Sequence, residues 1–291
     1  MKLDNTRNAL PHAGLTLADI VYLEEVEYGI TRIAAVFNST IPDRIGPVRS
    51  ARITDLDLLS QYGSPGFAFS GAQRKLWPAI DASSLIDLSA NKAPSDYQRD
   101  GSRRAPYNYF LNGQEAVGDN SDISVDRSIG LTFAAVPPAG GVPTTAADLK
   151  WSYASARFKY DPGTGRYAVN LNGERATAEE GDGRQWADTV VIQLVKQNPS
   201  AYFDKGGGNT PHAKTIGQGK AIVLRDGLSY QATWSRESAE SGTLFTNELG
   251  IPLSFKPGQT WIALYDKSRE VKLKPRVTAS TSPSGSPSPT N

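Results

Sequence analysis

Three arginines fall within nine positions in the segment IPDRIGPVRSAR, residues 41–52. Arg44, Arg49 and Arg52 lie around a Gly-Pro bend and lead directly into a segment with the apolar spacing of a helix. A guanidinium group donates hydrogen bonds in a planar fork that fits phosphate and carboxylate groups, and a helix N-terminus adds free backbone N–H donors. The spacing therefore predicts a site for an anion.

Polar side chains from other segments are candidates to complete this site. The predicted ligand-binding residues are Arg32, Arg44, Arg49, Ser50, Arg52, Arg99, Arg104 and Asn108, and the predicted supporting residues are Glu24, Glu27, Asp55 and Asp100. Phosphate, pyrophosphate and carboxylate groups are the ligands that suit such a set. The alternative interpretation is that the arginines pair with the acidic residues as a structural ion network.

Other chemistries are less well supported by the residue pattern. Glu25 and Glu27 alternate along a β-prone run and could act as a glycosidase acid and base, but a polar hairpin face explains them more simply. Ser50 lacks the Gly-x-Ser-x-Gly context of a nucleophile elbow. Trp234 and Arg236 would share a strand face and could form a platform for carbohydrate or peptide, although core packing also explains the large aromatic residue.

The composition excludes several classes of protein. There is no cysteine, and His12 and His212 are the only histidines, so neither thiol chemistry nor a histidine-rich metal site is available and we predict no metal and no cofactor. Thirty-one basic against 30 acidic residues give a net charge of +1, which does not favour nucleic acid. No run of about 18 apolar residues predicts a membrane span, and the N-terminus is polar from its start.

The candidate site lies in an N-terminal domain predicted over residues 1–129. The β-prone runs at 20–27 and 30–37 predict a hairpin whose second strand is buried on both faces. Thr54 is the predicted N-cap of the helix that follows the arginines. Short strands and a helix alternate beyond it, which indicates an α/β-like layered domain.

Residues 130–275 are predicted to form a mostly antiparallel β domain, so the fold class of the whole chain is α+β. The dipeptides Asn172-Gly173 and Asp226-Gly227 are strong hairpin signals between strand-like runs. Residues 276–291 are rich in Ser, Thr and Pro, and we predict that they form a disordered tail.

Several of these motifs together resemble the YerB-like lipoproteins, a family built on a domain of unknown function. In the first domain the resemblance rests on ADIVY at 18–22, GPVRSAR at 46–52, RD at 99–100, RAP at 104–106 and Asn108. In the second domain it rests on YD at 160–161, NG at 172–173, GQG at 217–219, WSR at 234–236 and PGQTWI at 257–262.

The resemblance implies a two-domain protein of the bacterial cell envelope with no established reaction. Many members are exported and lipid-anchored, so we expect an extracytoplasmic, envelope-associated location, with a cytoplasmic location as the alternative. Where many relatives have histidine, before a double glycine and in an Ala-Pro-His-Asn motif, this chain has Phe69-Ser70-Gly71-Ala72 and Tyr107. These departures count against catalysis by histidine.

We therefore expect a binding or accessory module whose anion site recognises a phosphorylated or carboxylated envelope ligand. Its expected partners are an anionic envelope polymer, a lipid-linked precursor or another protein, and not a nucleic acid. The alternative is a hydrolase or transferase that acts on cell-wall glycan or lipid-linked phosphate substrates, and for it the sequence assigns no catalytic residue.

Overall fold

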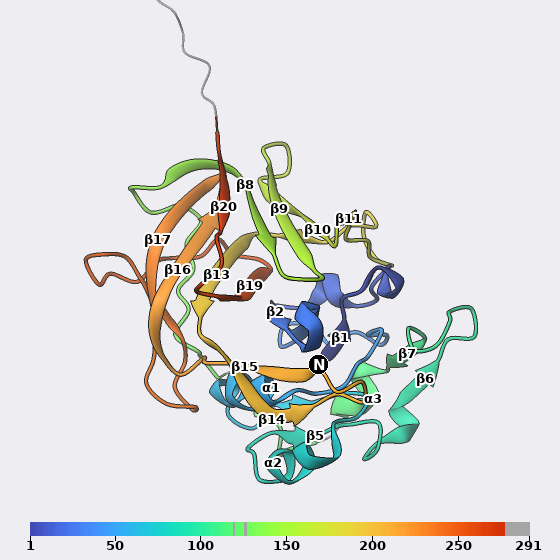
Figure 1. Cartoon of the computed structure of the whole chain (residues 1–291). Coiled ribbons are helices and arrows are strands. Elements are labelled where there is room, and N and C mark those ends of the chain that lie inside the picture. Colours follow the sequence, from blue (N-terminus) through green and yellow to red (C-terminus); the bar gives the residue numbers. More distant parts are fainter. Residues whose placement is uncertain (119, 125–126, 277–291) are drawn as a thin grey trace, which may run out of the picture.

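The computed structural model of this chain describes residues 1–118, 120–124 and 127–276. The predicted Ser/Thr/Pro tail lies outside these residues, apart from Arg276. The described chain is mainly β, and its α-helices are short (Figure 1). They are α1 (Ile53–Leu59), α2 (Trp77–Asp81) and α3 (Gly113–Val117).

One mixed sheet of 14 strands runs through the described parts of both predicted domains. Its strands, in spatial order, are β1 (Lys2–Asp4), β3 (Thr31–Val36), β2 (Ile20–Glu25), β19 (Thr260–Asp266), β13 (Thr189–Val195), β16 (Gly217–Arg225), β17 (Leu228–Arg236), β8 (Val142–Lys150), β9 (Ser155–Asp161), β10 (Arg166–Leu171) and β11 (Glu174–Arg175). Three strands branch from this path: β12 (Trp186–Ala187) pairs with β10, β18 (Leu244–Thr246) with β17, and β20 (Lys272–Pro275) with β8.

Three two-stranded sheets complete the described strands. They are β14 (Gln197–Phe203) with β15 (Asn209–Ala213), β4 (Gly66–Phe67) with β5 (Ile86–Asp87), and β6 (Tyr97–Arg99) with β7 (Tyr109–Leu111). The β14–β15 hairpin comes from the C-terminal part of the chain but lies against α1 of the N-terminal part (Figure 1). It therefore brings distant segments of the sequence together.

The predicted hairpin at 20–37 is confirmed, because β2 and β3 pair antiparallel with Ile20 opposite Val36. Parallel pairing of β2 with β19 then joins this hairpin to the C-terminal strands. Side chains along β2 alternate between two apolar clusters: Val21 belongs to one and Tyr22 to the other. This alternation accounts for the nearly continuous apolar sequence, since both faces of the sheet are covered.

The C-terminal strands from β16 to β10 pair antiparallel, as the turn signals predict. Asn172 and Asp226 have positive φ of 54° and 52°, and they lie in the β10–β11 and β16–β17 turns. A left-handed conformation at the first turn residue suits Asn and Asp followed by Gly. Both hairpin predictions from the Asn-Gly and Asp-Gly pairs are therefore correct.

The predicted α+β class is only partly right, because the chain is mainly β. The segments that were expected to alternate as strand and helix form the two-residue β4, a 3-10 turn at Arg74–Leu76 that leads into the five-residue α2, and the two-residue β5. Helices this short cannot cover a sheet as a layer, and most of their stability must come from tertiary packing. The N-terminal strands instead extend the sheet of the C-terminal strands.

The start of α1 also differs from the prediction. Arg52, not Thr54, is the N-cap, and its backbone N–H donates to Asp55 Oδ2 at 2.6 Å. The Thr54 hydroxyl instead accepts a hydrogen bond from the backbone N–H of Ala213 in β15. The Thr54 hydroxyl, which was predicted to cap the helix, therefore forms a tertiary contact instead.

The Trp234 and Arg236 platform is not formed. Trp234 and Arg236 are 2% and 1% exposed, and Trp261 is fully buried. The Trp234 indole N–H donates to the Leu194 carbonyl, and Arg236 Nη2 donates to the Asp57 carbonyl. The core-packing interpretation of these residues is therefore the correct one.

Candidate functional site

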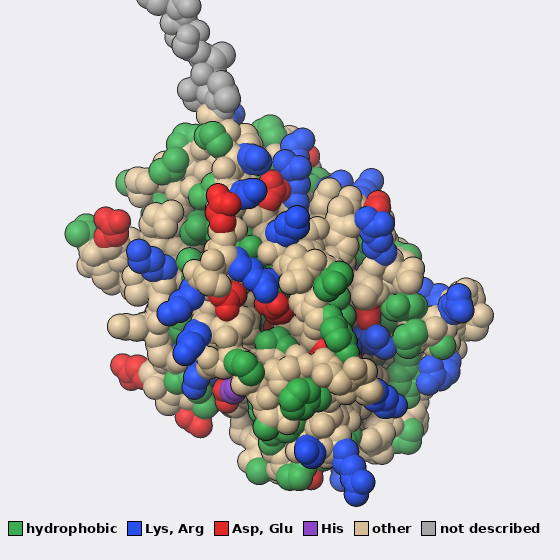
Figure 2. Space-filling model, in the orientation of Figure 1, with side chains coloured by type: hydrophobic (Ala, Val, Ile, Leu, Met, Phe, Trp, Pro, Cys, Tyr) green, Lys and Arg blue, Asp and Glu red, His purple; other side chains and the backbone are tan. Residues whose placement is uncertain are grey.

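The predicted site residues lie in three groups. The first group lies around the end of strands β1, β3 and β2 and contains Arg32, Arg49, Ser50, Arg52, Glu24, Glu27 and Asp55. The second group is the pair of Arg44 and Asp100. The third group lies on or beside the β6–β7 hairpin and contains Arg99, Arg104 and Asn108. We call Arg32, Arg49 and Arg52 the buried arginine cluster. On the face shown in Figure 2, basic side chains lie among acidic and hydrophobic ones.

Strand register places the buried arginine cluster. Asp4 of β1 and Glu24 of β2 both lie opposite Arg32 of β3, so these three residues form one row across the sheet. The GPVRSAR segment runs along the outer side of β1, where Val48 forms a bridge with Leu3 and the Arg49 N–H donates to the Lys2 carbonyl. Residues far apart in the sequence are thus aligned by one sheet edge.

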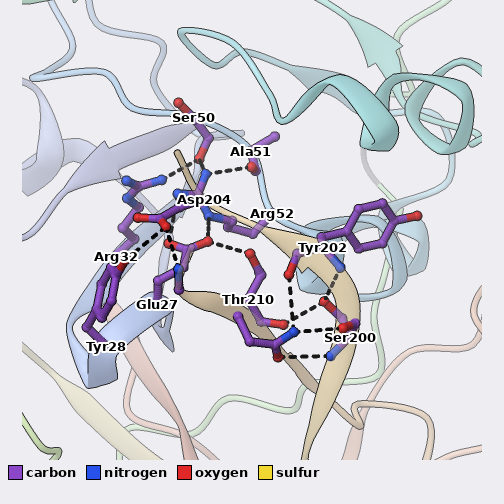
Figure 3. A network of polar contacts seen from close by, with 12 residues as sticks. Glu27, Tyr28, Arg32, Ser50, Ala51, Arg52, Ser200, Tyr202, Asp204 and Thr210 are labelled. Carbon is purple, nitrogen blue, oxygen red and sulfur yellow. Dashed lines mark hydrogen bonds and ion pairs between the residues drawn. The ribbon is translucent and has the colours of Figure 1, made fainter. Parts of the chain in front are cut away.

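Arg52 is held by two contacts to Glu27, from Nε to Oε1 at 2.5 Å and from Nη2 to Oε2 at 2.8 Å (Figure 3). The Thr210 hydroxyl of β15 donates to the same Oε1, also at 2.5 Å. Burial alone raises the pKa of Glu27, but the Arg52 and Thr210 contacts outweigh it and the pKa is lowered. Glu27 is therefore an ionised partner of Arg52.

Lys2 occupies a second buried ionic group beside the cluster. Its Nζ lies 3.0 Å from Glu24 Oε1 and 2.9 Å from Asp55 Oδ1, and none of the three side chains is more than 1% exposed. Burial, followed by the nearby charge of Asp55, raises the pKa of Glu24 to about 8. The Glu24 carboxyl therefore holds its proton more strongly than an exposed glutamate does, and Lys2 Nζ donates a hydrogen bond to its Oε1.

Arg32 differs from Arg49 and Arg52 in its lack of a direct carboxylate partner among the described residues. It is 7% exposed, its Nη1 donates to the Ser50 carbonyl at 3.1 Å, and within the described chain no carboxylate lies within ion-pair distance of it. Burial lowers the pKa of Arg32 to about 9, with further lowering by the charges of Arg52 and Arg49. A buried guanidinium without a direct carboxylate partner is a site that an anion would stabilise.

Arg49 connects this buried cation to the surface. Its Nε lies 2.6 Å from Asp4 Oδ2, and its side chain is 25% exposed while that of Asp4 is 2% exposed. Among the described residues, the terminal nitrogens of Arg49 and the hydroxyl of Ser50 form no hydrogen bond. These donors are consequently free for a ligand.

Arg44 lies apart from the buried arginine cluster and is neutralised. Its Nη2 lies 2.6 Å from Asp100 Oδ2 and its Nε lies 3.0 Å from Glu179 Oε2. Its guanidinium carbon lies 3.6 Å from the centroid of the Phe110 ring, a cation–π contact. Hydrogen bonds from Ser102, followed by the contact with Arg44, lower the pKa of Asp100 to about 2. This part of the predicted set matches the structural ion-network interpretation.

The third group lies on an outer hairpin. Arg99 Nη1 donates to Asn108 Oδ1 at 3.0 Å, and the Arg99 guanidinium lies over the Tyr109 ring. Arg104 is exposed, and its side chain has no hydrogen bond or ion pair with the other described residues. The structure therefore does not bring these residues to Arg32.

Sequence reasoning missed several contributors. Asp4, Thr210 and Glu179 each bind one of the predicted residues, and no local motif marks them. It also missed a cavity of about 900 Å³ bounded by segments of both predicted domains. Among the described residues no group of three or more His, Asp or Glu side chains is arranged to hold a metal ion.

The acidic pair considered for glycosidase chemistry is held in ion pairs. Glu25 contacts Arg269 Nη2 at 2.7 Å, and Glu27 contacts Arg52. A glycosidase needs one carboxylate to act as an acid and another as a nucleophile or base. Two separately paired carboxylates do not provide that arrangement.

Comparison with known proteins gives the family. Residues 1–124 match the N-terminal domain, and residues 147–262 the C-terminal domain, of the protein family of unknown function DUF3048. The chain belongs to this family. It is also 48% identical over 271 residues to "Putative lipoprotein YerB" of Bacillus subtilis (strain 168), an alignment that covers 89% of this chain and 78% of the relative.

A solved structure has the same fold. The crystal structure of the YerB protein from Bacillus subtilis superimposes with a TM-score of 0.75, covering 90% of this chain and 88% of that chain. The sequence identity over the superimposed residues is 21%, lower than the 48% of the sequence alignment. The family assignment rests on the two domain matches and not on either identity. No helix in the described residues is long and apolar enough to cross a membrane.

Proposed function

We propose that this chain is a binding module of the bacterial envelope that captures an anionic group at Arg32, Arg49 and Ser50. The proposal rests on the environment of Arg32, whose residue is 7% exposed and whose guanidinium has, among the described residues, a backbone carbonyl as its one direct partner. Phosphate and carboxylate groups are the anions that a guanidinium fork binds with the best geometry. An envelope location follows the lipoprotein name of the relative.

The local charge balance supports an anion in this position. Three guanidinium groups in the buried arginine cluster face two carboxylates, those of Asp4 and Glu27. Glu24 cannot supply the missing charge, because burial raises its pKa to about 8 and its Oε1 contacts Lys2. One bound anion would neutralise the remaining positive charge and relieve the repulsion among the three arginines.

A binding role fits the carboxylates better than catalysis does. Glu25, Glu27, Asp55 and Asp100 each lie in an ion pair, so none is free to act as a general base. The hydrolase or transferase alternative has no supporting observation of its own. The ligand that we propose is therefore a phosphorylated or carboxylated component of the envelope, either a polymer or a lipid-linked precursor, held without being cleaved.

Calorimetric titration with inorganic phosphate, pyrophosphate and citrate tests this proposal. Arg49→Ala should weaken binding of the best of these probes at least about tenfold, since hydrogen bonds to charged groups contribute roughly 1.5–3 kcal/mol. Arg32→Met should weaken it similarly. Arg104→Ala is the matched control, because it removes an arginine side chain that has no partner among the described residues, and it should leave the affinity unchanged.

Three results would reject the proposal. The first is the absence of binding of all three anions by the unmodified protein at millimolar concentration. The second is an affinity that does not change in folded Arg49→Ala and Arg32→Met proteins. A loss of binding in Arg104→Ala alone would place the site on the β6–β7 hairpin instead and would also overturn this assignment.

A further inference from the structure

The cavity of about 900 Å³ is separate from the buried arginine cluster, none of whose members lines it. Its walls come from the start of β2, the ends of β3 and α1, the loop before β6, and α3. Its apolar lining residues include Ile20, Val36, Leu59, Leu88, Leu111 and Ala116. Both predicted domains contribute, since Pro257, Gly258 and Gln259 close one side.

The polar side chains in the lining are already bonded within the protein. Asp19 accepts from the backbone N–H groups of Asn38 and Ser39, and from the Ser39 hydroxyl. Gln259 donates to the Leu15 and Ala18 carbonyls and accepts from the Trp261 indole N–H. These polar groups of Asp19 and Gln259 therefore form hydrogen bonds within the cavity wall and are not available to a ligand.

The remaining polar side chains that line the cavity also have partners within the protein. Arg166 pairs with Asp188 at 3.3 Å, Arg127 donates to the Glu240 carbonyl, and the Tyr62 hydroxyl bonds that of Tyr22. The partners of the other polar lining residues, Thr16, Asn38, Ser124 and Ser128, also lie in the protein. A polar ligand inside the cavity would lose its hydrogen bonds to water and gain few in return, which is unfavourable.

We infer that the cavity binds the hydrocarbon chain of an amphiphilic molecule and that the polar head of this molecule remains at the rim. When hydrocarbon covers an apolar wall, the binding free energy becomes more favourable in proportion to the apolar area removed from water. This interaction requires no hydrogen-bond partner in a fixed direction. The volume lies at the upper end of the range for small-molecule sites. It suits one flexible chain, whereas a docking protein would need a broad surface rather than a hollow.

The rim has the character that this ligand requires. Phe133 lines the cavity and is 52% exposed, and Val117 and Phe37 are half-buried lining residues. Apolar side chains at an opening allow a chain to enter without the removal of a charged group from water. An acyl chain and an isoprenoid chain share this chemistry, and the experiment below separates the two sources.

The test uses the full chain after extraction of bound lipid. A fluorescent polyene fatty acid is titrated into the protein, and palmitic acid and farnesyl phosphate then compete for the site. Ala116→Phe should weaken probe binding at least about tenfold, because the phenyl group occupies cavity volume. Val117→Phe, at a half-buried position where extra volume is easier to accommodate, should weaken it in the same direction. Ala82→Phe is the matched control at an exposed alanine outside the lining.

The outcomes are distinct. Stronger competition by palmitic acid identifies acyl chains, and stronger competition by farnesyl phosphate identifies isoprenoid chains; either result supports the inference. Failure of the unmodified protein to bind the probe overturns it, as does unchanged binding in folded Ala116→Phe or Val117→Phe protein. Arg32→Met should retain probe binding while it loses anion binding, so failure of one site is distinguishable from failure of the other.

Discussion

Glu24→Gln provides the sharpest test of the buried ionic group. In the folded protein the Glu24 carboxyl is buried beside Lys2 and Asp55, and its pKa rises from 4.5 to about 8. Between these two values the folded chain keeps a proton that the unfolded chain has released. The stability that this proton contributes is fully present below pH 4.5 and is lost as the pH rises through about 8.

The magnitude follows from proton linkage. A group protonated in the folded state and ionised in the unfolded state changes the free energy of unfolding by about 1.4 kcal/mol per pH unit. Glutamine cannot ionise, so the variant lacks this slope. Between about pH 5.5 and about pH 7.5, the variant should gain on the order of 2–3 kcal/mol of stability relative to the unmodified protein.

Urea unfolding at the two pH values, with linear extrapolation to water, measures the difference directly. The comparison between variant and unmodified protein cancels the contributions of all other titrating groups. Glu248→Gln, at an exposed position, is the control and should show no such change. A Glu24→Gln difference that stays constant within about 0.5 kcal/mol would refute the raised pKa and, with it, the charge balance proposed for the buried arginine cluster.

The remaining predictions concern the arginine-rich segment. Arg52→Met leaves Glu27, which is 3% exposed, without its counter-charge, and should lower the free energy of unfolding by about 3 kcal/mol, while Arg52→Lys should lower it less. Urea unfolding of both variants measures this, and equal losses would show that a positive charge without the guanidinium fork gives Glu27 no stabilisation. Gly46→Ala places a Cβ against the Phe110 ring, on which Arg44 stacks, and should destabilise by about 1–3 kcal/mol. Thermal unfolding tests this second change, and an unchanged midpoint would mean that Phe110 moves without loss.

Local sequence was sufficient to predict several elements. The 20–37 hairpin and the Asn-Gly and Asp-Gly turns were predicted correctly because β-prone runs on either side of a glycine turn, and left-handed turn residues, are properties of neighbouring positions. The cluster of arginines near α1 was visible for the same reason. The family resemblance rests on such local motifs and is confirmed by the matches over both domains.

Pairings between distant segments decided the rest. Parallel pairing of β2 with β19 made one sheet of two predicted domains, and the β14–β15 hairpin supplied Thr210 to Glu27 and the Ala213 N–H to Thr54. No periodicity in the sequence encodes these contacts, since each joins residues more than 150 positions apart.

The sequence by itself determined which residues could bind an anion, namely a set of arginines and their acidic neighbours. Only the tertiary structure decided which of them are neutralised. Arg44 and Arg52 form ion pairs with carboxylates from other segments. Arg32 is buried opposite Glu24, and Lys2 binds Oε1 of Glu24. The physical reason is that the charge state of a guanidinium site depends on burial and on partners within a few ångströms, and both are set by the fold.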